Sequence, residues 1–343
     1  MQPNALASRI PSARIMPLVQ RPAPPRPEAQ LIQLIGTDSD RLAAELDAGL
    51  RATPPHVSPK FLYDELGSRL FDAITRLPEY YPTRTEAAIF ARHRHEIGAA
   101  IGAGGTLIDL GAGDCRKAEA LFADLQPRQY VALDISVDYL AGALDRLARE
   151  WPHIDMLGLG LDLSVDFELP ADVGATRRLF FYPGSSLGNF APDAAVALLA
   201  RLRGQSGDDG QLLIGVDLVK PTALLEAAYD DALGVTAAFN RNLLLNANRL
   251  LGADFRAADW RHLARYDHAL ARIDMYLEAR YDIEVAWQGR SRFFPMGTRI
   301  HTESSHKYQP DGIRKLLQRA GWTLTDLWTD ERQHFAVVHA VAA

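Results

Sequence analysis

The sequence of 343 residues contains one cysteine, Cys115, and no apolar run as long as a membrane-spanning helix. A single cysteine excludes internal disulfides and every zinc site built from several cysteines, and it fits a reducing compartment. A helix needs roughly 18 consecutive apolar residues to cross a bilayer. We therefore expect a soluble, cytoplasmic protein that does not enter a membrane.

Basic residues are not in excess either. The formal net charge is -6 at pH 7, and the isoelectric point is about 5.9. A protein that binds nucleic acid usually concentrates lysine and arginine on one face. The charge balance argues against a broad nucleic-acid interface and favours chemistry on a small molecule.

The sequence also lacks a pattern of metal ligands. His93 and His95 are two positions apart on a predicted helix, so their side chains do not share a face. His301 and His306 have no cluster of acids or thiols around them in the sequence. We expect no metal site.

Acidic residues are absent from the start of the chain up to Glu28, where prolines and arginines are frequent. The charge resembles that of a transit peptide, but the prolines would break an amphipathic helix and no apolar signal core is present. Residues 1–28 are therefore predicted to be a disordered tail.

The rest of the chain changes character twice. Residues 31–50, 61–81 and the stretch from Thr85 onward have helical spacing. Short apolar runs then alternate with helical stretches, which predicts a parallel sheet covered on both faces, a Rossmann-like α/β core. These predicted strands lie within residues 106–114, 130–136, 154–163, 177–189 and 210–219.

The alternation stops after Pro221. Helical patterns are expected over 222–270 and antiparallel strands over 273–308, before a helix and two strands complete the sheet. We predict a core made of residues 96–221 and 310–343. Residues 29–95 and 222–309 are predicted to join in a second, α+β domain that binds substrate.

The first predicted strand ends in the turn LGAGDCRK, which contains Gly111 and Gly113. Asp134 closes the second strand about 20 residues later, where an acid can hold ribose hydroxyls. The third glycine of a dinucleotide-binding turn is missing, and a Gly-Trp turn precedes the last two strands. This pattern favours S-adenosylmethionine over a nicotinamide cofactor, although Asp134 could instead simply cap a helix.

Three further residues lie near this predicted cofactor site. Asp162, at the end of the third strand, is placed to reach the adenine amino group. Lys117 follows the glycine turn and is a weaker candidate, because a solvated surface lysine is the ordinary alternative. Cys115 has no histidine paired with it in the sequence and is interpreted as a packing residue.

Five segments in order give the chain a specific resemblance, which extends over residues 31–343. The segments are PEYYPTRTE, LIDLGAGDCRK, FFYPGSSLGNF, DDALGVTAAFNRN and RIHTESSHKY. Together they resemble the L-histidine Nα-methyltransferases of ergothioneine biosynthesis. The resemblance implies a methyltransferase core with a second domain, S-adenosylmethionine as methyl donor, and trimethylation of L-histidine to hercynine.

The resemblance also implies roles for individual residues. Asn189 would bind the amino and carboxylate groups of the substrate, and Tyr63 would lie beside the nitrogen that is methylated; these are the two catalytic candidates. Tyr80 would hold the carboxylate, while Tyr81 would be mainly structural. The remaining implied substrate ligands are Gly184, Tyr229 for the carboxylate, Met275 for the side chain, and Glu303 and Ser305 for the imidazole.

Two other functions remain open at this stage. The same fold could methylate another amino acid, such as tryptophan or tyrosine, and Glu303 is the residue that discriminates this case. A catalytically silent nucleoside-binding regulator would bind the cofactor without turnover.

Overall fold

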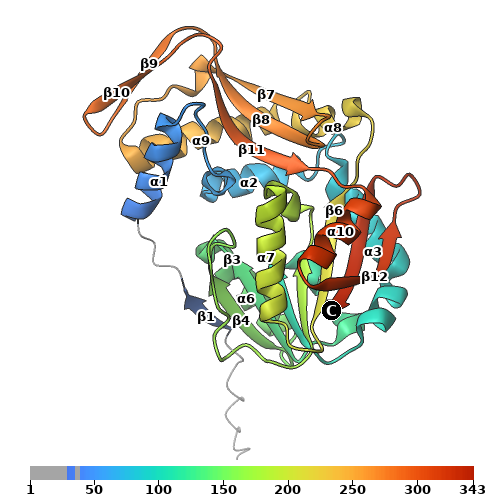
Figure 1. Cartoon of the computed structure of the whole chain (residues 1–343). Helices are drawn as coiled ribbons and strands as arrows, with labels where there is room; N and C mark the ends of the chain where they lie inside the picture. Colours follow the sequence, from blue (N-terminus) through green and yellow to red (C-terminus); the bar gives the residue numbers. More distant parts are fainter. Residues whose placement is uncertain (1–28, 35–38) are drawn as a thin grey trace, which may run out of the picture.

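The computed structural model describes residues 29–34 and 39–343, so the predicted tail at 1–28 lies outside the described residues. Its larger sheet has eight strands in the order β1-β4-β3-β2-β5-β6-β13-β12 (Figure 1). Strand β13 is antiparallel to both of its neighbours, and the strands from β1 to β6 are parallel. This is the predicted Rossmann-like α/β core. The strands are β1 (Gln30–Gln33), β2 (Thr106–Leu110), β3 (Gln129–Asp134), β4 (Asp155–Gly160), β5 (Arg178–Tyr182), β6 (Gln211–Asp217), β12 (Trp322–Thr329) and β13 (Phe335–Ala342).

Helices cover both faces of this sheet, which explains why its central strands are apolar runs rather than alternating patterns. Leu107 and Ile108 in β2 are both buried but belong to hydrophobic clusters on opposite faces. One face packs against α3 (Tyr81–Ile101), α4 (Arg116–Glu119), α5 (Phe122–Leu125) and α6 (Val137–Glu150). The other face packs against α7 (Pro192–Gly204) and α10 (Pro310–Arg319).

A second group of elements lies above the large sheet in Figure 1. Its antiparallel sheet has the order β11-β8-β7, and a separate hairpin pairs β9 with β10. One hydrophobic cluster draws its buried side chains from residues 46–81 and 225–300, which favours the predicted grouping of these stretches. The elements are α1 (Ser39–Arg51), η1 (Pro59–Leu62), α2 (Glu65–Ile74), α8 (Thr222–Tyr229), α9 (Val235–Leu251), η3 (Ala257–Asp259), β7 (Trp260–Asp267), β8 (Arg272–Ala279), β9 (Ile283–Trp287), β10 (Arg290–Phe294) and β11 (Arg299–His306).

Two predicted helical stretches contain strands instead. The helix expected from residue 31 is wrong at β1, whose Leu31 fills space over Gly158; a Cβ there would lie 2.5 Å from Leu31 Cδ1. The helix expected through residue 270 is wrong at β7, which pairs with β8 along its whole length. Both errors have one cause, because pairing with a distant strand overrides local propensity.

Helix α3 starts earlier than predicted and crosses the predicted domain boundary. It begins at Tyr81 rather than Thr85, since Pro82 lacks an N–H and fits the first helical turn. The boundary predicted after residue 95 falls inside this helix. Ile89 and Ile97 are both buried against the large sheet, so this part of the chain packs with the core.

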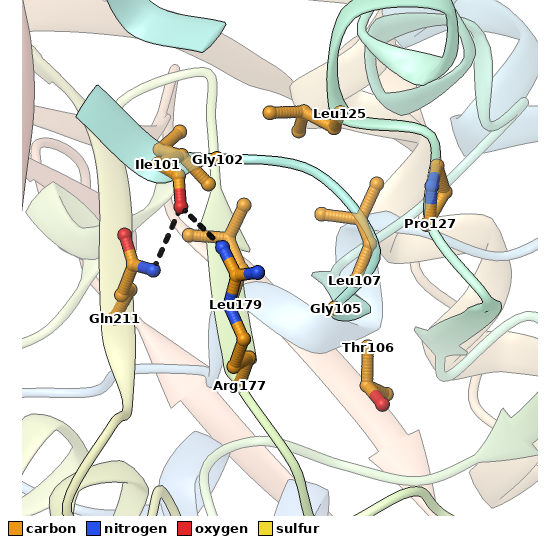
Figure 2. A pocket seen from close by; sticks show the side chains of 10 residues that line it. All are labelled: Ile101, Gly102, Gly105, Thr106, Leu107, Leu125, Pro127, Arg177, Leu179 and Gln211. Atoms are coloured by element: carbon orange, nitrogen blue, oxygen red, sulfur yellow. Dashed lines mark hydrogen bonds between the residues drawn. The ribbon is translucent and has the colours of Figure 1, made fainter. Parts of the chain in front are cut away.

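The end of the large sheet at which β5 and β6 begin has a structural role. Arg177 Nη2 and Gln211 Nε2 each donate to the carbonyl oxygen of Ile101 at 3.0 Å, as Figure 2 shows. They satisfy a backbone acceptor at the C-terminus of α3, which helix geometry leaves without a partner. The cavity beside them holds only about 10 Å³, too little for a ligand.

Candidate active site

The largest opening relevant to the predicted cofactor is a cavity of about 480 Å³ beyond the carboxyl ends of β2, β3 and β4. Open parallel sheets bind their ligands at this position. Four of the five predicted cofactor residues line it, namely Gly111, Gly113, Asp134 and Asp162. Its opposite wall comes from the N-terminal elements η1 and α2, through Lys60, Tyr63, Ser68 and Phe71 among others.

The glycine turn leaves open space for a ligand. Gly111 and Gly113 have φ angles of 69° and 53°, a region that disfavours residues with a Cβ. No heavy atom lies within 4 Å of an ideal Cβ built on either glycine. A nucleoside can therefore approach this backbone closely, which is the fit expected for S-adenosylmethionine.

Asp134 organises the same turn. Its Oδ2 accepts from the Gly113 N–H and its Oδ1 from the Ser136 N–H, both at 2.9 Å. Burial raises the pKa of Asp134, although these backbone donors oppose the shift. Asp134 thus fixes the turn between β3 and α6 and also lines the cavity, and each oxygen keeps a lone pair for a ribose hydroxyl.

Asp162 connects the two halves of the structure. It accepts from the Ser164 hydroxyl at 2.5 Å and from Lys60 Nζ at 3.1 Å. Burial would raise the pKa of Asp162, but these donors outweigh it and the pKa is lowered. The carboxylate therefore stays ionised beside the cavity, and sequence reasoning missed Lys60 as its partner.

Lys117 is the predicted cofactor residue that does not line the cavity. Its Nζ pairs with Glu86 at 2.7 Å, and the other oxygen of Glu86 accepts from the Gly184 N–H at 2.7 Å. Glu86 is only 1% exposed, and the sequence pattern did not reveal it. Lys117 supports the turn at Gly184, while its direct contact with a cofactor stays a prediction.

A second, smaller cavity of about 50 Å³ adjoins the first. Tyr63 and Asn189 line both cavities, so the two spaces meet at the two predicted catalytic residues. Every predicted substrate residue lines the smaller cavity together with Tyr63: Tyr80, Gly184, Asn189, Tyr229, Met275, Glu303 and Ser305. The structure therefore brings together residues that lie as far apart in the sequence as Tyr63 and Ser305.

Among the described residues that line the smaller cavity, Glu303 alone is acidic. It follows a bulge in β11, pairs with Met275 across the sheet, and accepts a 2.9 Å hydrogen bond from Asn189 Nδ2. Burial raises its pKa to about 7, although Lys307 and Asn189 oppose the shift. The pocket thus contains a buried acceptor that can change charge near neutral pH.

The tyrosines of the pocket remain protonated. Burial raises the pKa values of Tyr63 and Tyr80 well above their ordinary range. Within the described part of the chain, neither hydroxyl has a hydrogen-bond partner, although both rings line the cavity. Edge-to-face contacts hold Tyr63 to Phe239 and Tyr80 to Tyr229, with ring centroids 5.4 and 6.2 Å apart. Two unpaired hydroxyls in an aromatic pocket are well suited to a polar ligand.

A buried charge cluster lies behind this pocket. Asp217 accepts from the Tyr81 hydroxyl at 2.6 Å and pairs with Lys307 at 3.0 Å, and it also contacts Lys220. The predicted structural role of Tyr81 agrees with this contact. Sequence reasoning missed the two lysines, although lysine is rare in this arginine-rich chain and four of its five lysines lie around the site: Lys60, Lys117, Lys220 and Lys307.

Replacing Glu303 by glutamine should stabilise the empty protein at neutral pH. The raised pKa means that the folded state favours protonated Glu303, so ionisation between pH 4.5 and about 7 removes stability. At about 1.4 kcal/mol per pKa unit, the full effect is roughly 3 kcal/mol. Glutamine does not ionise. In urea unfolding, the free energy of unfolding of the variant relative to the wild type should therefore be higher at pH 8 than at pH 4.5.

The exposed Glu168 supplies the control for this measurement. Glu168→Gln makes the same chemical change at an exposed position and reports the effect of the substitution alone. If the stability change caused by Glu303→Gln depends on pH no more than that caused by Glu168→Gln, the buried charge of Glu303 does not destabilise the folded protein.

The described residues contain no group of three or more histidine, cysteine, aspartate or glutamate side chains suited to a metal ion. Among the same residues, no helix is long and apolar enough to cross a membrane.

Comparison with known proteins gives the family. A model described as histidine-specific methyltransferase, SAM-dependent, matches residues 42–342. The chain is 39% identical to a histidine N-alpha-methyltransferase of Mycolicibacterium smegmatis, covering 91% of this chain and 98% of that protein. It is 30% identical to ergothioneine biosynthesis protein 1 of Neurospora crassa, covering 85% and 35% respectively. It is 25% identical to a 4-dimethylallyltryptophan N-methyltransferase of Claviceps purpurea, covering 85% and 92%. With the two joined cavities and the family match over nearly its whole length, the chain belongs to the S-adenosylmethionine-dependent, histidine-specific methyltransferases.

Proposed function

We propose that this protein trimethylates the α-amino nitrogen of L-histidine to give hercynine, as a cytoplasmic enzyme of ergothioneine biosynthesis. The observation that carries the proposal is the Asn189–Glu303 hydrogen bond at the junction of the two cavities. In this proposal the Asn189 amide would bind the reacting end of an amino acid, and the neighbouring Glu303 carboxylate would bind its side chain. No nucleic acid or membrane takes part in this reaction.

The reaction needs a neutral amine whose lone pair points at the methyl carbon of the donor. When bound, S-adenosylmethionine would supply a methyl group from its sulfonium: the amine lone pair bonds to the methyl carbon as the carbon–sulfur bond breaks, and S-adenosylhomocysteine leaves. Each new ammonium would release a proton to solvent before the next transfer. An α-amino group has a pKa near 8, so a fraction is neutral at physiological pH. Asn189 and Tyr63 line both cavities and would hold the amine N–H groups, leaving the lone pair directed at the donor.

Tyr63 acts here as a hydrogen-bond partner and not as a base. Burial raises the pKa of its hydroxyl, so the phenolate is not available to take a proton. Positioning therefore accounts for most of the catalysis that this chain supplies. The carboxylate of the substrate would accept from the Tyr80 hydroxyl, which lines the cavity. Tyr229 was predicted to share this role, but its hydroxyl donates to Ser305 Oγ at 2.8 Å.

The final product carries a trimethylammonium group, which has no N–H to donate. Aromatic faces attract such a cation by roughly 0.5 to 2 kcal/mol. Tyr63, Phe71 and Phe239 form a contiguous aromatic wall on this side of the pocket. This wall would keep the mono- and dimethylated intermediates bound as hydrogen bonds to the nitrogen are lost.

Selectivity for histidine would come from the side of the pocket that β11 forms. Glu303 would accept from a ring N–H, and Ser305 would contact the second ring nitrogen. A buried polar group left unpaired costs about 1 to 3 kcal/mol, so a side chain without ring N–H groups is disfavoured.

A second candidate substrate is an aromatic amino acid related to tryptophan. The similarity to the Claviceps purpurea protein favours it, since that relative is named for a tryptophan derivative. Glu303 and Ser305 together weigh against it, because a single indole N–H can pair with Glu303 but leaves the Ser305 hydroxyl without a ring acceptor.

The test is mass spectrometry of the purified protein incubated with S-adenosylmethionine and all twenty amino acids in equal amounts. The proposal expects a gain of three methyl groups on histidine alone. Methylation of tryptophan or tyrosine in place of histidine would contradict this proposal and support an aromatic amino acid as the substrate. Cofactor binding without any methylation would indicate a silent regulator.

A further inference from the structure

Lys307 lies directly behind the substrate pocket and does not line it. It follows β11 two residues after Ser305, and its side chain is 0% exposed. Its Nζ lies 2.7 Å from Ser305 Oγ, 3.0 Å from the Tyr229 hydroxyl and 3.0 Å from Asp217 Oδ2. Lys307 therefore reaches a ligand through its hydrogen bonds to Tyr229 and Ser305, and through its charge, which opposes the raised pKa of Glu303.

An ammonium group has three N–H donors and accepts nothing. Lys307 has three acceptors around it, so every donor has a partner. Both hydroxyl oxygens that it contacts are consequently acceptors toward Lys307, and each must direct its own proton elsewhere.

Ser305 is the more constrained of the two hydroxyls. Its Oγ accepts from Lys307 and also from the Tyr229 hydroxyl at 2.8 Å. A hydroxyl oxygen has two lone pairs, and both are then occupied. Ser305 lines the cavity, so its remaining capacity is a single donor for a bound side chain.

We propose that Lys307 is a positioning residue that locks Ser305 as a hydrogen-bond donor toward the substrate ring. The inference rests on the proposed function, in which Glu303 accepts from a ring N–H. The pocket then requires one ring nitrogen that donates and a second that accepts. Neutral imidazole meets both requirements, whereas indole, phenol and pyrrole do not.

The charge cluster explains how a lysine is kept in place here. Asp217 is 0% exposed and also contacts Lys220 and the Tyr81 hydroxyl. When Lys307 is replaced by methionine, Asp217 keeps these two partners, so no carboxylate is left buried and unpaired. The Lys307→Met variant is therefore expected to fold.

The experiment compares kcat/KM for histidine with kcat/KM for two analogues that carry pyrrole in place of imidazole, one for each position of the ring nitrogen. Each analogue keeps one N–H and replaces the acceptor nitrogen by C–H. The wild type should prefer histidine by roughly tenfold to a hundredfold, because the Ser305 donor is left unpaired by pyrrole.

Lys307→Met frees the Ser305 hydroxyl to rotate, so this preference should fall by about tenfold. Ser305→Ala should lower it to a similar extent, and the double variant should show no further fall, as expected for residues acting through one contact. Lys315→Met, at an exposed lysine of α10, is the matched control and should leave the preference unchanged.

A purely structural lysine would reduce turnover of histidine and analogues alike, leaving the ratio intact, and that result would overturn the inference. Equal use of histidine and a pyrrole analogue by the wild type would overturn it without any variant. Absence of histidine methylation by the wild type is a different outcome, since it contradicts the proposed function itself.

Discussion

Asn189→Ala should lower kcat/KM for histidine by about a hundredfold to ten-thousandfold. Asn189 lines both cavities and is proposed to hold the amino and carboxylate groups of the substrate. Hydrogen bonds to charged groups contribute about 1.5 to 3 kcal/mol each, and two of them give this range. The fall should be accompanied by little change in S-adenosylmethionine affinity, which calorimetry with the purified variant would measure.

Ser186→Ala is the control for Asn189, because Ser186 lies on the same short helix, η2 (Ser186–Asn189), and also lines both cavities. Its hydroxyl donates to the Pro183 carbonyl at 3.2 Å and has no proposed contact with the reacting nitrogen. The control should lose only a few-fold in activity. A loss below tenfold in Asn189→Ala would remove Asn189 from the reacting centre.

Glu303→Ala should change which amino acid the enzyme prefers. The variant loses the buried acceptor for the ring N–H, so kcat/KM for histidine should fall by roughly tenfold to a hundredfold. Phenylalanine has no ring N–H to donate to that acceptor and gains space, so its kcat/KM should hold or rise. The measurement is a competition between the two amino acids, with product masses read from one reaction.

Ser304→Ala provides a matched control on the same strand. Ser304 neighbours Glu303 but bonds to Asp274 at 2.6 Å, away from the cavity. Its loss should leave the preference for histidine unchanged. If Glu303→Ala also kept the wild-type preference, the selectivity would have to come from another part of the pocket.

The cofactor half of the fold could be predicted from the sequence because its signals are local. Apolar strands that end at Gly111 and at Asp134 define a turn and an acid whose positions follow from the parallel sheet alone. The roles of the substrate-binding residues, by contrast, were predicted only from the resemblance to a known family. A tyrosine such as Tyr80, taken alone, is equally compatible with a packed core position.

The local signals failed where long-range pairing decides the outcome. Residues 31–33 and 260–267 were predicted to be helical but form strands, because they pair with β4 and β8. Lys117 could not be assigned from sequence, since its ion-pair partner is the buried Glu86, 31 residues away.

The sequence by itself determined the class of the core, the glycine turn and the acids at the strand ends, since these depend on neighbours within a few residues. Tertiary structure alone decided which side chains meet. Asn189 and Glu303 are 114 positions apart, and Tyr81 and Asp217 are 136 apart. Burial of Glu303 and the pairing of Lys307 with Asp217 likewise arise only when β11 packs beside the end of β6. Desolvation acts on the assembled pocket, and no local pattern in the chain encodes it.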